Sequence, residues 1–239
     1  MTRILLEGAL SLLRDRTEEI MKRNHLAIGI IILVITVAAG YALWNRHQTT
    51  LLRDATLARI DHATQALRNT IAPSTDPVAK SQAVSVAADR IDNDLTALRA
   101  ADTSRILLLG AGADTYLHSV RELLKRQAAL LVLDSGLRHG ITAFRDHLRS
   151  ENRGATWGAT AVQHKNRLEQ DFREYRSAFD AHTRIIDGLP DALKTLSAQA
   201  PEITLPSAAE VANLRSATMA SAAAITSEME TLRRIAAPR

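Results

Sequence analysis

The stretch Asp114–Leu148, DTYLHSVRELLKRQAALLVLDSGLRHGITAFRDHL, decides the fold class. Mostly apolar residues recur in it at alternating steps of three and four, without a break for more than four heptads. This spacing places them on one face of a helix, and a helix with such a face packs against other helices. We therefore predict a helix from Asp114 to Arg149. Its packing face, here called its seam, is Tyr116, Val120, Leu123, Gln127, Leu130, Asp134, Leu137, Ile141, Phe144 and Leu148.

The same rhythm returns after the turn-like sequence Ser150–Gly154 and continues from Trp157 to Ile185. We expect this second long helix to end at Asp187–Gly188 and a short helix to follow Pro190. Because the connection is short, the two long helices should form an antiparallel hairpin. Folding the chain about Asn152–Arg153 sets Leu148 opposite Trp157, Phe144 opposite Ala161, Ile141 opposite His164 and Leu137 opposite Leu168.

The remaining helices follow from the same pattern and from capping residues. The first helix of the bundle is expected from Arg46 to about Ala72, and a second one from Pro77, capped by Asp76, to about Arg99. Residues 200–206 read as a linker flanked by prolines, and 207–239 as an alanine-rich helix that packs on the bundle or on a partner. Ser207 and Glu210 form the S-x-x-E pattern of a capping box. Gly110 and Gly112 indicate a weak helix or a close approach of two backbones.

The stretch Leu26–Trp44, LAIGIIILVITVAAGYALW, is uncharged and apolar on all sides of a helix. Its length approaches the thickness of the hydrocarbon core of a bilayer, so we interpret residues 26–44 as a single transmembrane signal-anchor helix. Residues 1–25 are expected to form a cytoplasmic amphipathic leader helix. Lys22 and Arg23 at one end of the span, and Tyr41 and Trp44 at the other, are its expected membrane-interface residues.

The fold class predicted from these patterns is all-α: one N-terminal transmembrane helix, then an elongated antiparallel helical bundle or coiled coil of four to five helices. The bundle occupies residues 45–199. Basic residues are slightly more frequent just before the span than just after it, which favours a cytoplasmic N-terminus. The expected location is the inner (plasma) membrane of a bacterium, with a periplasmic bundle.

The composition and the charge pattern of the chain exclude several classes of functional site. The chain has 239 residues, a net charge of +4 and no cysteine, which excludes disulfides, thiolate metal sites and cysteine nucleophiles. Its charges are interspersed, whereas nucleic-acid binders gather basic residues into a stripe, so nucleic acid is not an expected partner. The Gly110–Ala113 stretch lacks the lysine and the serine or threonine of a phosphate-binding loop. We expect no cofactor, no metal, no catalytic residue and no enzymatic activity.

One candidate site lies within the predicted hairpin. The register sets Asp134 against Asp171 and Arg138 against Arg167, and each aspartate has an arginine four residues away on its own helix. Such a polar layer would be a ligand site, a partner contact or a lock on the helix register. In the other interpretation the four side chains lie on the solvated rim of the hairpin.

Histidines and carboxylates offer weaker candidates. His164 and His182 lie on one seam but five turns apart, which fits hydrogen-bonded core or boundary histidines better than ligands of one metal ion. Asp114, His118 and Glu122 recur every four residues and are metal-ligand types. Because Arg121, Lys125 and Arg126 crowd that face, it is better explained as a solvated surface.

Two functions fit these features. The first is a membrane-anchored, non-catalytic scaffold or accessory subunit that binds other membrane or periplasmic proteins, or a second copy of the chain, beside the lipid bilayer. The second is a sensor or ligand-binding bundle. The layout of a span followed by a helical bundle is similar to that of chemoreceptor input domains, and the resemblance implies signalling. Because no second apolar run follows the bundle, such a sensor would act through a partner.

Overall fold

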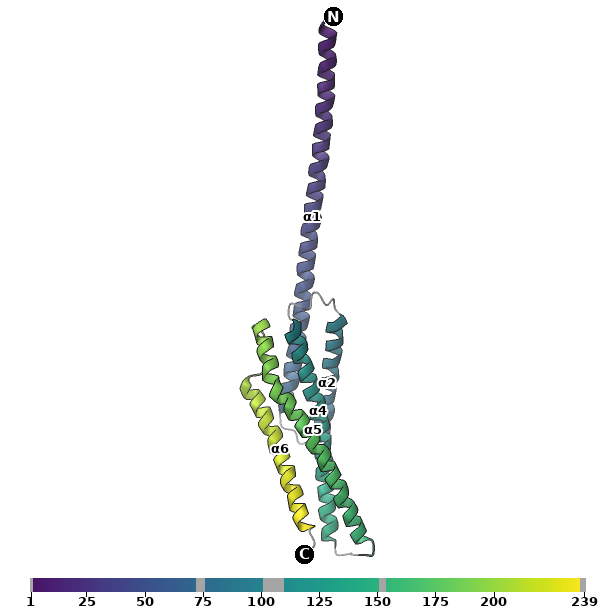
Figure 1. Cartoon of the computed structure of the whole chain (residues 1–239), viewed down its shortest axis with the longest axis vertical. Helices are drawn as coiled ribbons and strands as arrows, with labels where there is room; N and C mark the ends of the chain where they lie inside the picture. Colours follow the sequence, from purple (N-terminus) through teal and green to yellow (C-terminus); the bar gives the residue numbers. More distant parts are fainter. Residues whose placement is uncertain (1, 72–75, 101–109, 151–153, 237–239) are drawn as a thin grey trace. The chain divides into compact units, whose positions relative to one another are not determined.

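The structure is a computed structural model that describes residues 2–71, 76–100, 110–150 and 154–236, with side chains for 32–70, 76–100, 112–150 and 154–236. These residues form five helices and no strand, which confirms the all-α fold. Figure 1 labels them along the chain. They are α1 (Thr2–Ile71), α2 (Pro77–Ala100), α4 (Gly110–Arg149), α5 (Trp157–Gln199) and α6 (Ala208–Ile235).

The chain divides into two compact units, Met1–Leu52 and Arg53–Arg239. In the first unit, apolar side chains of α1 are exposed on consecutive residues, from 57% at Ile32 to 69% at Leu43. Among the residues that the structure describes, no helix is both long enough and apolar enough to cross a membrane. Residues 26–31 of the expected span lie outside the side chains that the structure describes, as do Lys22, Arg23 and the side chains of the leader.

The second unit is a helical bundle with two hydrophobic cores. The first core joins all five helices: the C-terminal part of α1, α2, the N-terminal half of α4, the C-terminal half of α5 and the start of α6. The residues of α2 that recur at steps of three and four are buried here. They are Val84, Ala88, Ile91, Leu95 and Leu98.

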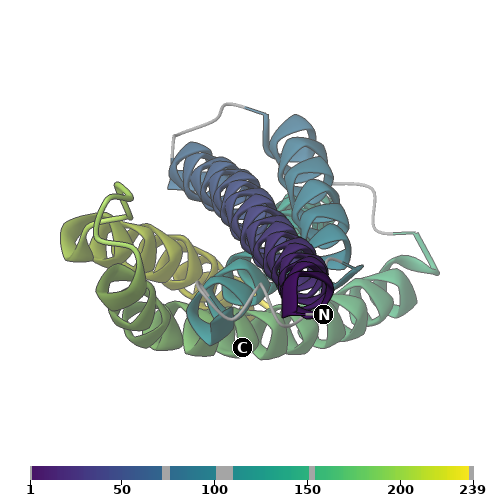
Figure 2. The same cartoon turned by 90° about the horizontal axis from the view of Figure 1, so that it is seen from above.

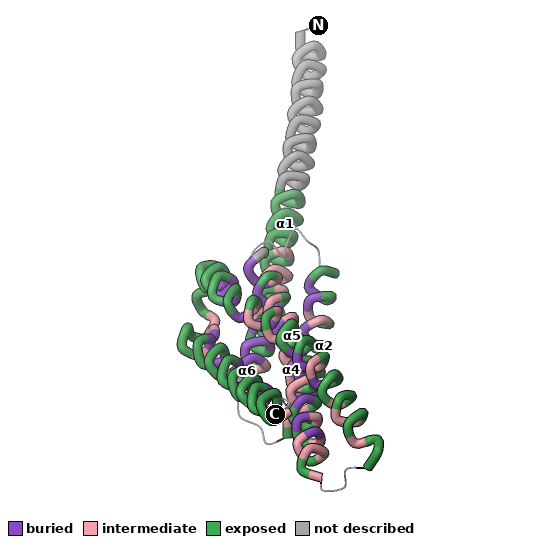
Figure 3. Tube along the Cα trace, turned by 60° about the horizontal axis from the view of Figure 1, so that its bottom comes forward, coloured by how far each residue is buried: buried purple, intermediate pink, exposed green. Residues whose placement is uncertain are grey.

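The second core is smaller, and its described residues belong to α4, α5 and α6. Figure 3 shows buried residues recurring along one side of these helices. From α4 it contains Leu130, Leu137, Ile141 and Phe144, all of them members of the predicted seam. Thus α4, which is 40 residues long, takes part in both cores, because its apolar rhythm continues for its full length.

The α4–α5 hairpin forms as predicted, but its contacts fall between the predicted layers. The ring of Phe144 stacks on that of His164, with centroids 6.1 Å apart, rather than lying opposite Ala161. Leu168 approaches Gly140, where an added Cβ would lie 2.9 Å from its Cδ2 atom. Side chains of packed helices insert between those of the partner, which shifts contacts away from a simple opposite pairing.

The expected end of a helix at Asp187–Gly188 is wrong, because α5 continues through Pro190 to Gln199. The residues after Gly188 keep the helical spacing of the buried face, with Leu189, Leu193 and Leu196 all in the first core. Pro190 lies on the exposed side of the helix, so its ring does not interrupt the buried face. The burial of these apolar side chains therefore keeps α5 helical through Gly188 and Pro190, although such residues usually end a helix.

Capping residues define two helix starts as predicted. The Asp76 carboxylate accepts hydrogen bonds from the backbone N–H groups of Val78 (2.9 Å) and Ala79 (3.0 Å). At α6, the Ser207 hydroxyl accepts from the Glu210 N–H (3.1 Å), and the Glu210 carboxylate accepts from the Ser207 N–H (2.7 Å). This is the complete capping box that the sequence indicated.

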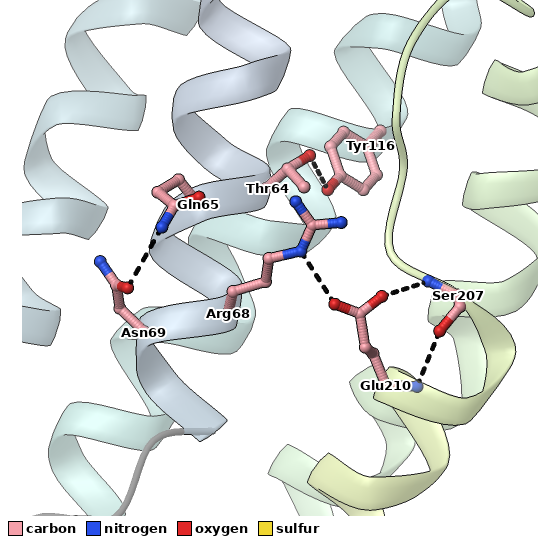
Figure 4. Close-up of polar contacts among 7 residues, drawn as sticks. All are labelled: Thr64, Gln65, Arg68, Asn69, Tyr116, Ser207 and Glu210. Carbon is pink, nitrogen blue, oxygen red and sulfur yellow. Dashed lines mark hydrogen bonds and ion pairs between the residues drawn. The ribbon is translucent and has the colours of Figure 1, made fainter.

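Polar contacts connect α1 to α4 and to the start of α6 (Figure 4). The Thr64 and Tyr116 hydroxyls are 2.9 Å apart and buried between α1 and α4. Arg68 on α1 donates to the Glu210 carboxylate at 2.8 Å. The Ser207 N–H and the Arg68 guanidinium together lower the pKa of Glu210 to about 2, so the contact stays charged in mild acid.

Candidate functional site

An open groove runs between α1 and α2, which lie side by side (Figure 2). Its volume is about 580 Å³, and the described residues that line it come from these two helices. From Lys80 to Asp94 the lining of α2 extends for roughly 21 Å at 1.5 Å per residue. The lining residues are His62, Gln65, Ala66, Asn69 and Thr70 from α1 and Lys80, Ala83, Val84, Val86, Ala87, Arg90, Ile91 and Asp94 from α2.

Small side chains explain why the groove stays open. Ala66 on α1 and Ala83 and Ala87 on α2 line it where larger residues would fill the space between two helices. Val84 and Ile91 turn toward the first core and are buried, whereas Val86 is 53% exposed. The groove therefore presents apolar surface to solvent along a channel between two helices.

The polar side chains of the groove are mainly neutral or basic. Asp94 is paired with Arg59 across the two helices at 3.3 Å, so its charge is compensated. Arg90 is exposed and forms no ion pair with any side chain that the structure describes. Burial lowers the pKa of Lys80, the other cation of the groove. With these apolar and basic side chains, the lining can bind apolar side chains and carboxylates.

The four residues of the predicted polar layer form two separate pairs. Arg138 donates to Asp134 on its own helix at 2.8 Å, and Arg167 lies 4.0 Å from Asp171 on its own helix. Among the described side chains, no hydrogen bond or ion pair joins the two pairs. The Arg167 side chain is 83% exposed, whereas that of Asp134 is only 17% exposed.

The Asp134–Arg138 pair is directed toward α6. Arg138 lies 3.5 Å from Glu228, and the Ser221 hydroxyl donates to Asp134 at 3.4 Å. Burial, reinforced by the negative charge of Asp134, raises the pKa of Tyr175 to about 12. Tyr175 belongs to the second hydrophobic core, and Asp134 and Glu228 lie along the part of α4 and of α6 that contributes to the same core. The polar contacts therefore connect α4 to α6 and are not confined to the hairpin. The contacts of this pair with α6 could not be predicted from the sequence, because contacts between helices that are far apart along the chain leave no local sequence pattern.

The two histidines of the α5 seam differ. His164 is half-buried and stacks with Phe144, with the ring of His147 5.4 Å from its own. His182 is fully buried, and neither ring nitrogen has a hydrogen-bond partner among the described residues. The expectation of a hydrogen-bonded core histidine is therefore wrong for His182. Burial, with a smaller contribution from Arg126, lowers its pKa to about 4.

The carboxylates of the second metal candidate are each paired with an arginine. Asp114 lies 3.5 Å from Arg99, and Glu122 lies 2.9 Å from Arg121. No group of three or more metal-ligating side chains was found within the part of the chain that the structure describes. Of the predicted membrane-interface residues, Tyr41 and Trp44 are exposed, with ring centroids 6.2 Å apart, and Lys22 and Arg23 lie outside the described side chains.

Comparison with known proteins adds no relative: no family model, curated protein or solved structure matches the chain.

Proposed function

We propose that the chain is a membrane-anchored, non-catalytic scaffold or accessory subunit whose helical bundle binds another protein of a membrane complex. The α1–α2 groove is the observation that carries this proposal. It is long, lined by two helices, apolar along its alanines and Val86, and bordered by charged side chains. An extended groove of this kind suits a helix of a partner, which would bury apolar surface that the chain alone leaves in water.

The proposed anchor is residues 26–44. In its described part, neighbouring residues such as Leu33, Val34 and Ile35 are each more than 60% exposed, although successive side chains of a helix point about 100° apart. Apolar side chains on every side are unfavourable in water and favourable in lipid. The exposed pair Tyr41 and Trp44 would lie at the boundary between lipid and water.

The proposed orientation places the N-terminus in the bacterial cytoplasm and the bundle in the periplasm. The chain has no cysteine, so one introduced cysteine reports the side of the membrane directly. Ser216 is exposed on α6 and suits a Ser216→Cys variant. In intact cells with a permeable outer membrane, a membrane-impermeant maleimide should label it without lysis. Labelling only after lysis would contradict the proposed orientation. Release of the full chain from membranes by alkaline carbonate would contradict the proposed membrane anchor.

A sensor that binds a small ligand is the second candidate, favoured by the volume of the groove. Its volume of about 580 Å³ lies within the range of roughly 300–1,000 Å³ that is typical of small-molecule pockets. We rank it second because the lining residues are spread along a channel rather than converging on one point.

A large side chain that fills the groove tests whether a partner protein binds there. Ala83 lines the groove and is exposed, so an Ala83→Trp side chain can occupy the groove without entering the core. Ala217 on α6 is also exposed but lies outside the groove, so Ala217→Trp is the matched control. A stoichiometric partner should co-purify in mild detergent with the wild type and the control but not with Ala83→Trp. Equal recovery with all three chains would contradict the proposal.

A further inference from the structure

A pocket lies between the C-terminal half of α5, the linker 200–206 and the start of α6. Its volume is about 560 Å³, within the range of roughly 300–1,000 Å³ that is typical of small-molecule sites. Its described lining extends from Ile186 to Ser197 on α5 and from Ala208 to Arg215 on α6, or roughly 16 Å and 10 Å at 1.5 Å per residue. The pocket is therefore shorter than the α1–α2 groove, and three segments of the chain contribute to its lining.

The floor of the pocket is apolar and belongs to the bundle. Ile186, Leu193 and Val211 line it and are each at most 9% exposed, because they are also members of the first core. Leu205 and Pro206 of the linker complete the lining. Since these side chains are held by the packing of the core, they form a fixed apolar surface against which the body of a ligand can pack.

The charges of the pocket leave one cation without a partner. Asp187 and Arg215 both line the pocket and pair across α5 and α6 at 2.9 Å, so their charges compensate each other. Lys194 lines the pocket from α5 and is exposed. Its ammonium forms no ion pair with any side chain that the structure describes, including Asp191 three residues before it. Lys194 can therefore pair with an anion that enters the pocket.

The register of α5 and α6 shows at which end of the pocket this cation lies. Two ion pairs join these helices, Asp187–Arg215 and Glu169–Arg233. Between them α5 advances by 18 residues, from 169 to 187, while α6 goes back by 18, from 233 to 215, so the helices are antiparallel. Lys194 lies seven residues beyond Asp187, level with the first turn of α6 and about two turns from the ion pair. The free cation is thus at the linker end, and the compensated charges are at the other end.

We propose that this pocket binds a small amphipathic carboxylate, whose apolar body packs on Ile186, Leu193 and Val211 and whose charged group pairs with Lys194. The pocket is separate from the α1–α2 groove, so this inference goes beyond the proposed docking function and does not depend on it. A cationic ligand would be repelled by the ammonium, and a neutral one would gain nothing from it. Because Lys194 is exposed, its charge adds modestly to an affinity that comes mainly from apolar contact.

Naphthoate and its uncharged analogue naphthamide test the assignment, because they share one aromatic body and differ in charge. Each compound is titrated into the full chain in neutral detergent micelles at low salt, and micelles without protein give the blank. Binding is measured by isothermal titration calorimetry. Naphthoate should bind at least threefold more tightly than naphthamide, and added salt should reduce this difference, since the charge of an exposed lysine is screened.

Substitutions in the pocket supply the matched tests. Lys194→Gln should abolish the preference for naphthoate and leave the affinity for naphthamide unchanged, whereas Lys165→Gln, at an exposed lysine of α5 outside the pocket, should keep the preference. Ala212 is exposed and lines the pocket, so Ala212→Trp should abolish the binding of both compounds. Ala217→Trp on the same helix, outside the pocket, should bind both as the wild type does. Circular dichroism of each variant verifies that the helices persist.

The opposite results overturn the inference. If neither compound binds the wild type, or if Ala212→Trp binds both unchanged, the pocket is not a ligand site. If naphthoate and naphthamide bind equally, or if Lys194→Gln keeps the preference, the anionic ligand is refuted. The Ala83→Trp test of docking concerns a different surface, so failure here leaves the proposed docking function standing.

Discussion

Replacing His182 with leucine should stabilise the bundle and remove part of its sensitivity to acid. The imidazole is fully buried and neither nitrogen is hydrogen-bonded to a described residue, so folding strips water from two polar atoms without compensation. An unpaired buried polar group of this kind costs about 1–3 kcal/mol. At pH 7.5, where the ring is neutral in both states, the His182→Leu variant should therefore gain stability of about that size.

The pH dependence gives a larger and more specific signal. Burial lowers the pKa of His182 from 6.5 to about 4, so the unfolded chain takes up a proton at a pH where the folded chain does not. As the pH falls from about 6.5 to about 4, this difference should destabilise the wild type by about 3 kcal/mol, at 1.36 kcal/mol per pKa unit. Below about pH 4 both states are protonated and the loss stops growing.

Urea denaturation of the full chain in neutral detergent, followed by circular dichroism at several pH values, measures both effects. Carboxylates titrate in the same range but are identical in the two proteins, so the difference between wild type and variant isolates His182. His139→Leu, which replaces an exposed histidine of α4, is the control and should leave the pH profile unchanged. If His182→Leu has the same pH profile as the wild type, the buried neutral imidazole is refuted.

Three further predictions concern the contacts around the bundle. Ser207→Ala removes half of the capping box and should cost about 1 kcal/mol in thermal or urea unfolding, with Ala217→Ser as a control on the same helix. Tyr116→Phe leaves the buried Thr64 hydroxyl without its partner and should lower the free energy of unfolding by about 1–2 kcal/mol. Adding Thr64→Val to the same chain should recover part of this loss of stability. If the losses from the two substitutions are instead additive, the two hydroxyls are not directly hydrogen-bonded. Burial raises the pKa of Tyr116 to about 12, so its phenol should stay neutral at pH 11 in an ultraviolet titration, and Tyr116→Phe should remove no absorbance change below that pH.

The all-helical fold could be predicted from sequence because its main signal is local and repeated. The residues of the α4 rhythm from Tyr116 to Phe144 are mostly buried, and α4 ends at Arg149 as predicted. The capping residues Asp76 and Ser207 act through neighbours three residues away or fewer, so they too can be recognised locally. Gly112 also fits its prediction of a close approach, because an added Cβ would lie 3.4 Å from the backbone of Leu196.

The features that sequence reasoning missed depend on pairing between distant helices. The local signal of Gly188 and Pro190 indicated a break, but the buried face of α5 continues past it in the first core. The Asp134–Arg138 pair was assigned to the hairpin, and only the position of α6 shows that Glu228 and Ser221 lie beside it. The groove had no sequence signal, since it arises from alanines on α1 and α2 that face one space.

Photo-crosslinking from the groove tests the central claim most directly. A benzophenone amino acid at Val86, which lines the groove and is 53% exposed, should crosslink one partner protein in intact membranes. The same amino acid at Val162, which is 58% exposed on α5 outside the groove, is the matched control and should not capture that partner. Crosslinks from Val86 that disappear in the Ala83→Trp background support docking in the groove. Equal crosslinking from both valines, or none from Val86, would contradict it.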